Sequence, residues 1–166
     1  MTQEATMELS ESEARPGEAA EVRRVAELLG GPRVLRHRLR NALDVHEALA
    51  AGLPGAALTH LLDSLVSLRD PASIERAVGI SRRTFQRRKA APKKPLSPEQ
   101  SGRTWTFAAV LAKATAAFGS QAAAEQWLER PAIGLDQRRP IDLLATPTGV
   151  RLIEEHLGRI EYGVYA

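Results

Sequence analysis

Apolar residues recur at steps of three and four along most of the 166-residue chain, a period that predicts amphipathic α-helices. The clearest apolar stripe consists of Leu58, Leu61, Leu62, Leu65 and Val66. No segment alternates convincingly with a period of two, and alanine is abundant. We therefore expect an all-α fold, with a first helix that starts at Glu21 and stops at Gly30.

Residues that can cap a helix indicate where the other helices begin. The predicted caps are Asp44, Ser73, Ser81, Ser97, Ser120 and Thr146. A proline directly follows Ser97 and Thr146, where its fixed φ suits the first helical position. The segment 91–98 holds three prolines and is expected to join two halves of the chain.

Charge is distributed unevenly along the chain. The net formal charge is only +3, yet residues 81–100 carry seven basic side chains and one acidic side chain. Residues 1–18 are acidic and hold few large apolar groups, so we expect a flexible N-terminal tail. The basic segment is a candidate contact for a polyanion such as nucleic acid.

Several classes of protein are excluded or disfavoured by composition. The chain has no cysteine, which excludes disulfides, thiolate nucleophiles and cysteine zinc sites. No apolar run reaches the ~20 residues that span a bilayer, and the acidic N-terminus does not resemble a signal peptide. We expect a cytoplasmic protein.

The four histidines do not form a recognisable metal or catalytic arrangement. His37, His46, His60 and His156 lie in different segments, and the chain holds no phosphate-binding glycine loop. No nucleophile, base and orienting group come together in the pattern. The sequence predicts a binding protein without enzymatic activity, metal or cofactor.

Residues 74–89 have the pattern of a helix-turn-helix. Gly79 can adopt the positive φ of a tight turn between two helices. Ile80 and Phe85 can anchor the turn and the second helix in the core, which leaves the basic residues of that helix outside. One departure is Glu75, which stands four residues before the turn glycine at a position that is usually small.

Arginine, lysine and glutamine are the residues that bind DNA phosphates and base edges. Because the start of a recognition helix enters the major groove, the predicted base or near-base contacts are Ser81, Arg82, Arg83, Thr84 and Gln86. The predicted phosphate contacts are Arg87, Arg88, Lys89, Lys93 and Lys94. A solvated basic helix with no ligand is the alternative interpretation of a charge run alone.

Six of the seven aromatic residues lie beyond residue 100. We expect Phe118 and Trp127 in the core. Tyr162 and Tyr165 follow the last strong helical residue, so a partner's pocket is the better interpretation for them.

A series of short segments resembles the Xre/MbcA/ParS antitoxins of type II toxin–antitoxin modules, over about residues 20–166. The segments are Gly79-Ile-Ser-Arg-Arg-Thr-Phe-Gln-Arg-Arg, Leu96-Ser-Pro-Glu-Gln-Ser, Phe118-Gly, Ala124-Glu-Gln-Trp-Leu, Arg139-Pro-Ile-Asp-Leu-Leu-Ala-Thr and Leu157-Gly-Arg-Ile-Glu-Tyr-Gly-Val-Tyr-Ala. Single segments are weak signals, whereas the ordered series is specific.

The resemblance implies a helix-turn-helix DNA-binding and dimerisation domain over 19–95 and a toxin-binding domain over 96–166. It also implies a homodimer that represses its own operon at operator DNA and covers the active site of a RES-domain toxin that consumes NAD. The residues that it assigns to toxin binding are Trp127, Asp142, Leu143, Arg159, Glu161, Tyr162, Gly163, Val164, Tyr165 and Ala166. Trp127 and Leu143 can instead serve only the core.

Two other hypotheses remain open from the sequence. The chain can be a stand-alone transcription regulator whose second half only dimerises, or a toxin-binding protein whose helix-turn-helix only holds dimers together. A dimer is expected because one helix-turn-helix buries only about 600–1,000 Å² against DNA. We expect the leucine-rich helix around 58–66 to form the dimer contact.

Overall fold

The computed structural model describes residues 16–163, and this part of the chain is helical. The elements are α1 (Pro16–Leu28), α2 (Gly31–Leu35), α3 (Ala42–Ala51), α4 (Gly55–Asp63), α5 (Pro71–Val78), α6 (Arg82–Ala90), α7 (Pro98–Phe118), α8 (Gln121–Glu129), the 3-10 turn η1 (Ile133–Leu135), α9 (Pro140–Leu143) and α10 (Pro147–Glu161). The all-α prediction is confirmed. None of these helices is both long and apolar enough to cross a membrane.

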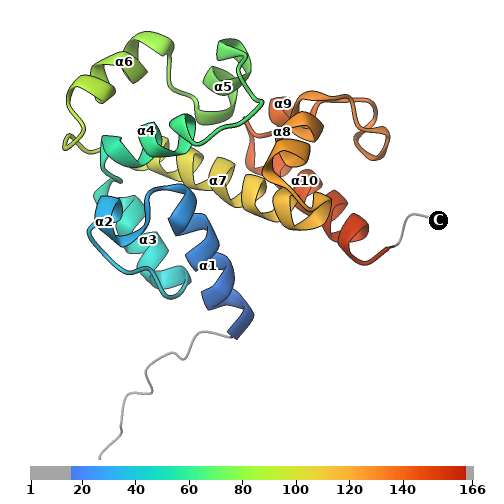
Figure 1. Cartoon of the computed structure of the whole chain (residues 1–166), viewed down its shortest axis with the longest axis horizontal. Helices are drawn as coiled ribbons and strands as arrows, with labels where there is room; N and C mark the ends of the chain where they lie inside the picture. Colours follow the sequence, from blue (N-terminus) through green and yellow to red (C-terminus); the bar gives the residue numbers. More distant parts are fainter. Residues whose placement is uncertain (1–15, 164–166) are drawn as a thin grey trace, which may run out of the picture.

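The long helix α7 organises the fold. It packs against α1, α3, α5, α8 and α10, and Figure 1 shows it crossing the middle of the molecule between the first helices and the last ones. Phe107, Leu111 and Ala114 on this helix are completely buried. Leucines from α4 and aliphatic residues from α10 belong to the same hydrophobic core cluster, so the two halves of the chain share one core.

Most predicted helix starts are confirmed. Ser81, Ser97, Ser120 and Thr146 are N-caps whose side chains accept a backbone amide proton three residues later. At the start of α7 the Ser97 amide also donates to the side-chain oxygen of Gln100, which completes a capping box.

Several details of the predicted helices were wrong. The N-cap of α3 is Asn41 rather than Asp44, and the N-cap of α5 is Asp70 rather than Ser73. Helix α1 begins at Pro16, before the predicted start at Glu21. Val66, which the pattern placed on the inner stripe, lies beyond the end of α4 and is 57% exposed.

A buried carboxylate joins the two halves of the chain. Glu125 of α8 is completely buried and accepts hydrogen bonds from the backbone amides of Val66, Ser67 and Leu68 at 2.9, 2.6 and 2.8 Å. Burial by itself would raise the pKa of Glu125, but the bonds from these amides outweigh it, so the pKa lies below its ordinary value. The carboxylate therefore fixes the segment before α5 against α8.

Candidate functional site

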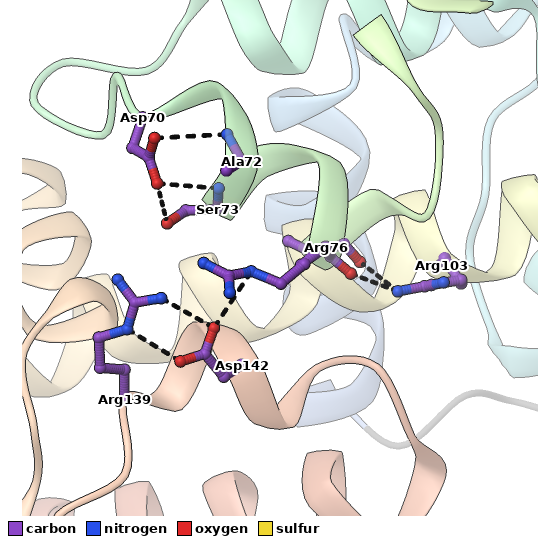
Figure 2. A network of polar contacts seen from close by, with 8 residues as sticks. Asp70, Ala72, Ser73, Arg76, Arg103, Arg139 and Asp142 are labelled. Atoms are coloured by element: carbon purple, nitrogen blue, oxygen red, sulfur yellow. Dashed lines mark hydrogen bonds and ion pairs between the residues drawn. The ribbon is translucent and has the colours of Figure 1, made fainter.

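The turn between α5 and α6 is built around a glycine. Gly79 has φ 66° and ends α5 by donating its amide proton to the backbone carbonyl of Glu75, at 2.8 Å. Arg103 of α7 donates hydrogen bonds to the carbonyls of Arg76 and Ala77, the first of which is visible in Figure 2. Its guanidinium occupies the space that a Cβ at residue 79 would need. The positive φ favours glycine here, and a larger residue would also displace the Arg103 guanidinium from the turn.

The anchors of the helix-turn-helix lie as predicted. Ile80 is buried in the turn, and Phe85 is half-buried against the core from α6. Helix α6 packs on α4, and α5 packs on α7 and α9. Phe85 and the half-buried Arg88 lie on the inner face of α6, and the exposed polar residues of the helix face solvent. Glu75, the unusual residue four before the glycine, is exposed and causes no clash.

The first turns of α6 present free arginines. Arg82, Arg83 and Arg87 are exposed, and none of them makes an ion pair or a side-chain hydrogen bond with any residue of 16–163. Gln86 is also exposed on this helix. These side chains are therefore available to phosphates and base edges.

Ser81 and Thr84 are engaged in the start of α6. The Ser81 hydroxyl oxygen accepts from the Thr84 amide at 3.2 Å, and the two hydroxyls lie 3.0 Å apart. Both positions border the exposed arginines. A base contact by either residue stays a prediction, and it has to coexist with the capping bond.

The phosphate-contact candidates at the end of α6 differ from one another. Arg88 is half-buried and donates to the carbonyl of Pro95 at 3.1 Å, so it holds α6 to the segment that follows. Lys89 is exposed and lies 3.9 Å from Asp63, a weak surface pair. Lys93 and Lys94 are exposed after the helix. Their role at phosphates stays a prediction.

The aromatic residues of α7 and α8 belong to the interior. Trp127 is half-buried between Phe118, with ring centroids 5.2 Å apart, and His156 of α10, with centroids 5.9 Å apart and rings nearly parallel. Burial, followed by the charge of Arg159, lowers the pKa of His156. This stacked group fixes α10 against α8, so Trp127 has a structural task.

Asp142 is part of an ionic contact between the two halves (Figure 2). Arg139 donates two parallel hydrogen bonds to its carboxylate at 2.8 and 2.9 Å, and Arg76 of α5 lies 3.4 Å away. The hydrogen bonds to Asp142 raise the pKa of Arg139. Asp70 caps α5 in the same view, and its hydrogen bond from Ser73 lowers its pKa. The carboxylate of Asp142 thus serves the junction of α5 and α9, and its role at a toxin stays a prediction.

The remaining candidates surround α10. Leu143 is half-buried, and its carbonyl sits where a Cβ of Gly149 would be, which closes α9 tightly onto α10. Arg159, Glu161, Tyr162 and Gly163 are exposed at the helix end, with Tyr162 82% exposed. Val164, Tyr165 and Ala166 lie outside the described residues.

Sequence reasoning missed four residues that matter to these surfaces. Arg103 supports the turn, Arg76 and Glu125 join the halves, and Ile133 is 85% exposed between α8 and α9. Each depends on contacts between distant segments, and no local pattern in the chain signals them.

The fold and the site define a helical DNA-binding protein with a second unit at its carboxyl end. Comparison with protein families supports both parts. Residues 44–109 match the Antitoxin Xre-like helix-turn-helix domain, and residues 113–163 match the Antitoxin Xre/MbcA/ParS C-terminal toxin-binding domain.

Curated relatives carry the same assignment. A protein of Yersinia enterocolitica named Antitoxin Xre is 34% identical over 130 residues, which cover 69% of this chain and 87% of the relative. A protein of the same name from Pseudomonas putida is 28% identical over 75% of this chain and 76% of its own length. Another, from Photorhabdus laumondii, is 34% identical over 55% of this chain and 62% of its own length. The chain belongs to the Xre/MbcA/ParS antitoxin family. It is an antitoxin with a DNA-binding domain and a toxin-binding domain, and this membership is typical of a regulator rather than an enzyme.

Proposed function

We propose that this antitoxin neutralises a RES-domain, NAD-consuming toxin and represses its own operon in the cytoplasm as a homodimer. The observation that carries the proposal is the separation of two free surfaces on one rigid core. Helix α6 and the end of α10 lie at opposite ends of the molecule (Figure 1). A toxin on α10 therefore leaves α6 accessible to DNA.

The DNA contact rests on Arg82, Arg83 and Arg87, which are charged, exposed and without partners in the described chain. A recognition helix of nine residues reads only a few base pairs. A second copy on an adjacent half-site supplies the missing specificity, which is the physical reason to propose a homodimer. The buried positions of Leu58 and Leu61 speak against α4 as the dimer contact, because both leucines belong to the protein's own core.

The toxin contact rests on the end of α10. Tyr162 combines a large apolar ring with a hydroxyl, and its 82% exposure leaves both available to a partner. It belongs to the tail that the family resemblance places near the toxin's active-site pocket. A segment placed there would exclude NAD directly.

Removal of residues 162–166 tests the toxin contact. We expect the shortened chain to lose suppression of toxicity when it is co-expressed with the proposed RES-domain toxin, and cellular NAD to fall. The deletion begins at the exposed residue that follows α10 and leaves the helix itself intact, so binding to operator DNA should be unchanged and serves as the control for folding. Full suppression by the shortened chain would rule out pocket blocking by this segment.

The double variant Arg82→Ala/Arg83→Ala tests the DNA contact. Removing one phosphate contact reduces the slope of log K against log salt by about 0.9, and removing one base contact costs about 1–3 kcal/mol. We expect weaker operator binding in a fluorescence anisotropy titration at several salt concentrations. The matched control is Arg33→Ala/Arg36→Ala, which removes the same charge from exposed positions in and after α2. Equal losses in both variants would show a general charge effect and not recognition by α6.

A further inference from the structure

The connection between α8 and α9 is a tightly bonded loop, which we name the stapled loop (residues 132–138). The Ala132 amide donates to the Arg138 carbonyl at 3.1 Å, and the Gln137 amide donates to the Ala132 carbonyl at 3.0 Å. Inside the loop, Leu135 and Asp136 donate to the carbonyls of Ala132 and Ile133. Backbone hydrogen bonds therefore hold the two ends of the loop together.

The stapled loop also has an unusual backbone. Asp136 and Gln137 are consecutive non-glycine residues with φ of 51° and 62°, a conformation that costs each of them free energy. Ala132 and Leu135 are buried in the core, and η1 packs against α10. The core and the bonds together hold the loop in one conformation.

This rigid loop presents an apolar side chain to solvent. Ile133 is 85% exposed, while Leu135, two residues later, is buried. In the part of the chain that matches the toxin-binding domain, it is the most exposed large hydrophobic side chain among the described residues. Because the backbone that carries Ile133 is already held in one conformation, binding through it costs little backbone entropy, which suits an interface anchor.

We propose that the stapled loop is a second toxin contact, in which Ile133 enters an apolar pocket on the toxin that carboxylates surround. This inference rests on the proposed function. Arg130 and Arg138 flank the apolar side chain, both are exposed, and neither makes a side-chain ion pair with the described residues. Residues 130–138 also hold the exposed carboxylate of Asp136, and the two exposed arginines leave a net positive charge beside Ile133, which complements a socket with an acidic rim.

The position of the loop supports a single continuous interface. It packs on α10 through η1, and Figure 1 shows it at the same end of the molecule as the end of α10. Ile133 on the loop and Tyr162 at the helix end then contact one toxin molecule at two places. The first gives affinity outside the active site, and the second covers the active site.

The test is the affinity of Ile133→Asp for the proposed RES-domain toxin, measured by calorimetry with the full chain. We expect at least about tenfold weaker binding, because hot-spot truncations cost this much or more. The matched control is Leu43→Asp, which places the same charge at an apolar residue that is 63% exposed in α3, outside the toxin-binding match. We expect less than about a threefold change for the control, as for a surface substitution away from an interface. Circular dichroism should show both variants folded, since both side chains are exposed.

The outcomes separate this inference from the proposed function. Tight binding by the natural chain and equally tight binding by Ile133→Asp would overturn the stapled-loop contact and leave the proposed function standing. Equal weakening by both variants would also overturn it, because the effect would not be local. No binding by the natural chain would overturn both. If light scattering shows that Ile133→Asp instead dissociates a dimer, the loop contacts a second copy and the inference is wrong.

Discussion

The Glu125 carboxylate shows how one buried charge can be stable in a small helical protein. Three consecutive backbone amides and the side chain of Gln121 donate to it. Residues 66–68 lie outside any helix, so their amides have no helical partners, and the carboxylate supplies the acceptor. The carboxylate therefore provides acceptors for the amides of residues 66–68, and these amides compensate the buried charge.

We predict that Glu125→Gln lowers the free energy of unfolding by about 2–3 kcal/mol, because an amide offers a single acceptor oxygen and turns a donor toward other donors. Urea denaturation measures the change. Glu154→Gln, on an exposed position of α10, is the control and should change stability by less than about 0.5 kcal/mol. The same loss in both variants would contradict a special role for the buried carboxylate.

The pH dependence of stability gives a second measure of the same interaction. Because the pKa of Glu125 in the folded state lies below its ordinary value of 4.5, its contribution is complete above that value. The contribution is lost as the pH falls through the lower, folded-state pKa. The natural chain should therefore lose more stability on acidification below about pH 4.5 than Glu125→Gln does. Parallel curves for the two proteins would contradict this assignment.

At the scale of the helices, local sequence determines most starts but not the choice between neighbouring caps. Asp44 and Ser73 were predicted as caps, and each stands three residues after the true one. Their amides donate the bond that the cap residue accepts. Since both positions hold a polar side chain that can cap a helix, the pattern allows either residue as the N-cap. At α5 the proline directly after Asp70 decides, because proline suits the first helical position.

The candidate site was predictable where it depends on one helix and unpredictable where it depends on two. The outward face of α6 follows from Gly79, Ile80 and Phe85, which are close in sequence. The inward turn of Arg88 and the bond from Arg103 to α5 join segments that no periodicity relates. The same holds for the stapled loop, in which Leu135 is buried while Ile133 is exposed. Long-range packing, rather than local propensity, sets these positions.

At the scale of the whole molecule, the proposed division at residue 95 does not separate two cores, and the match to the helix-turn-helix domain itself runs to residue 109. Helix α7 lies after that boundary, yet it packs against α1, α3 and α5 as well as against α8 and α10. The Arg76–Asp142 pair and the Glu125 bonds also cross it. The proposed DNA-binding half therefore has no complete core without α7. From this we expect the two halves to unfold together.

A core substitution in the first half tests this cooperativity. Leu61 of α4 is completely buried, so Leu61→Ala should cost about 2–5 kcal/mol. If the chain unfolds as one unit, the slowest-exchanging amides of α8 lose the same opening free energy as those of α4, although α8 is distant in sequence. Hydrogen exchange followed by NMR measures both sets, with Leu43→Ala as an exposed control. Unchanged protection in α8 would show two independent units. Equal loss would mean that a toxin bound at α10 also stabilises the helices that hold α6, because any ligand of the folded state stabilises the whole cooperative unit.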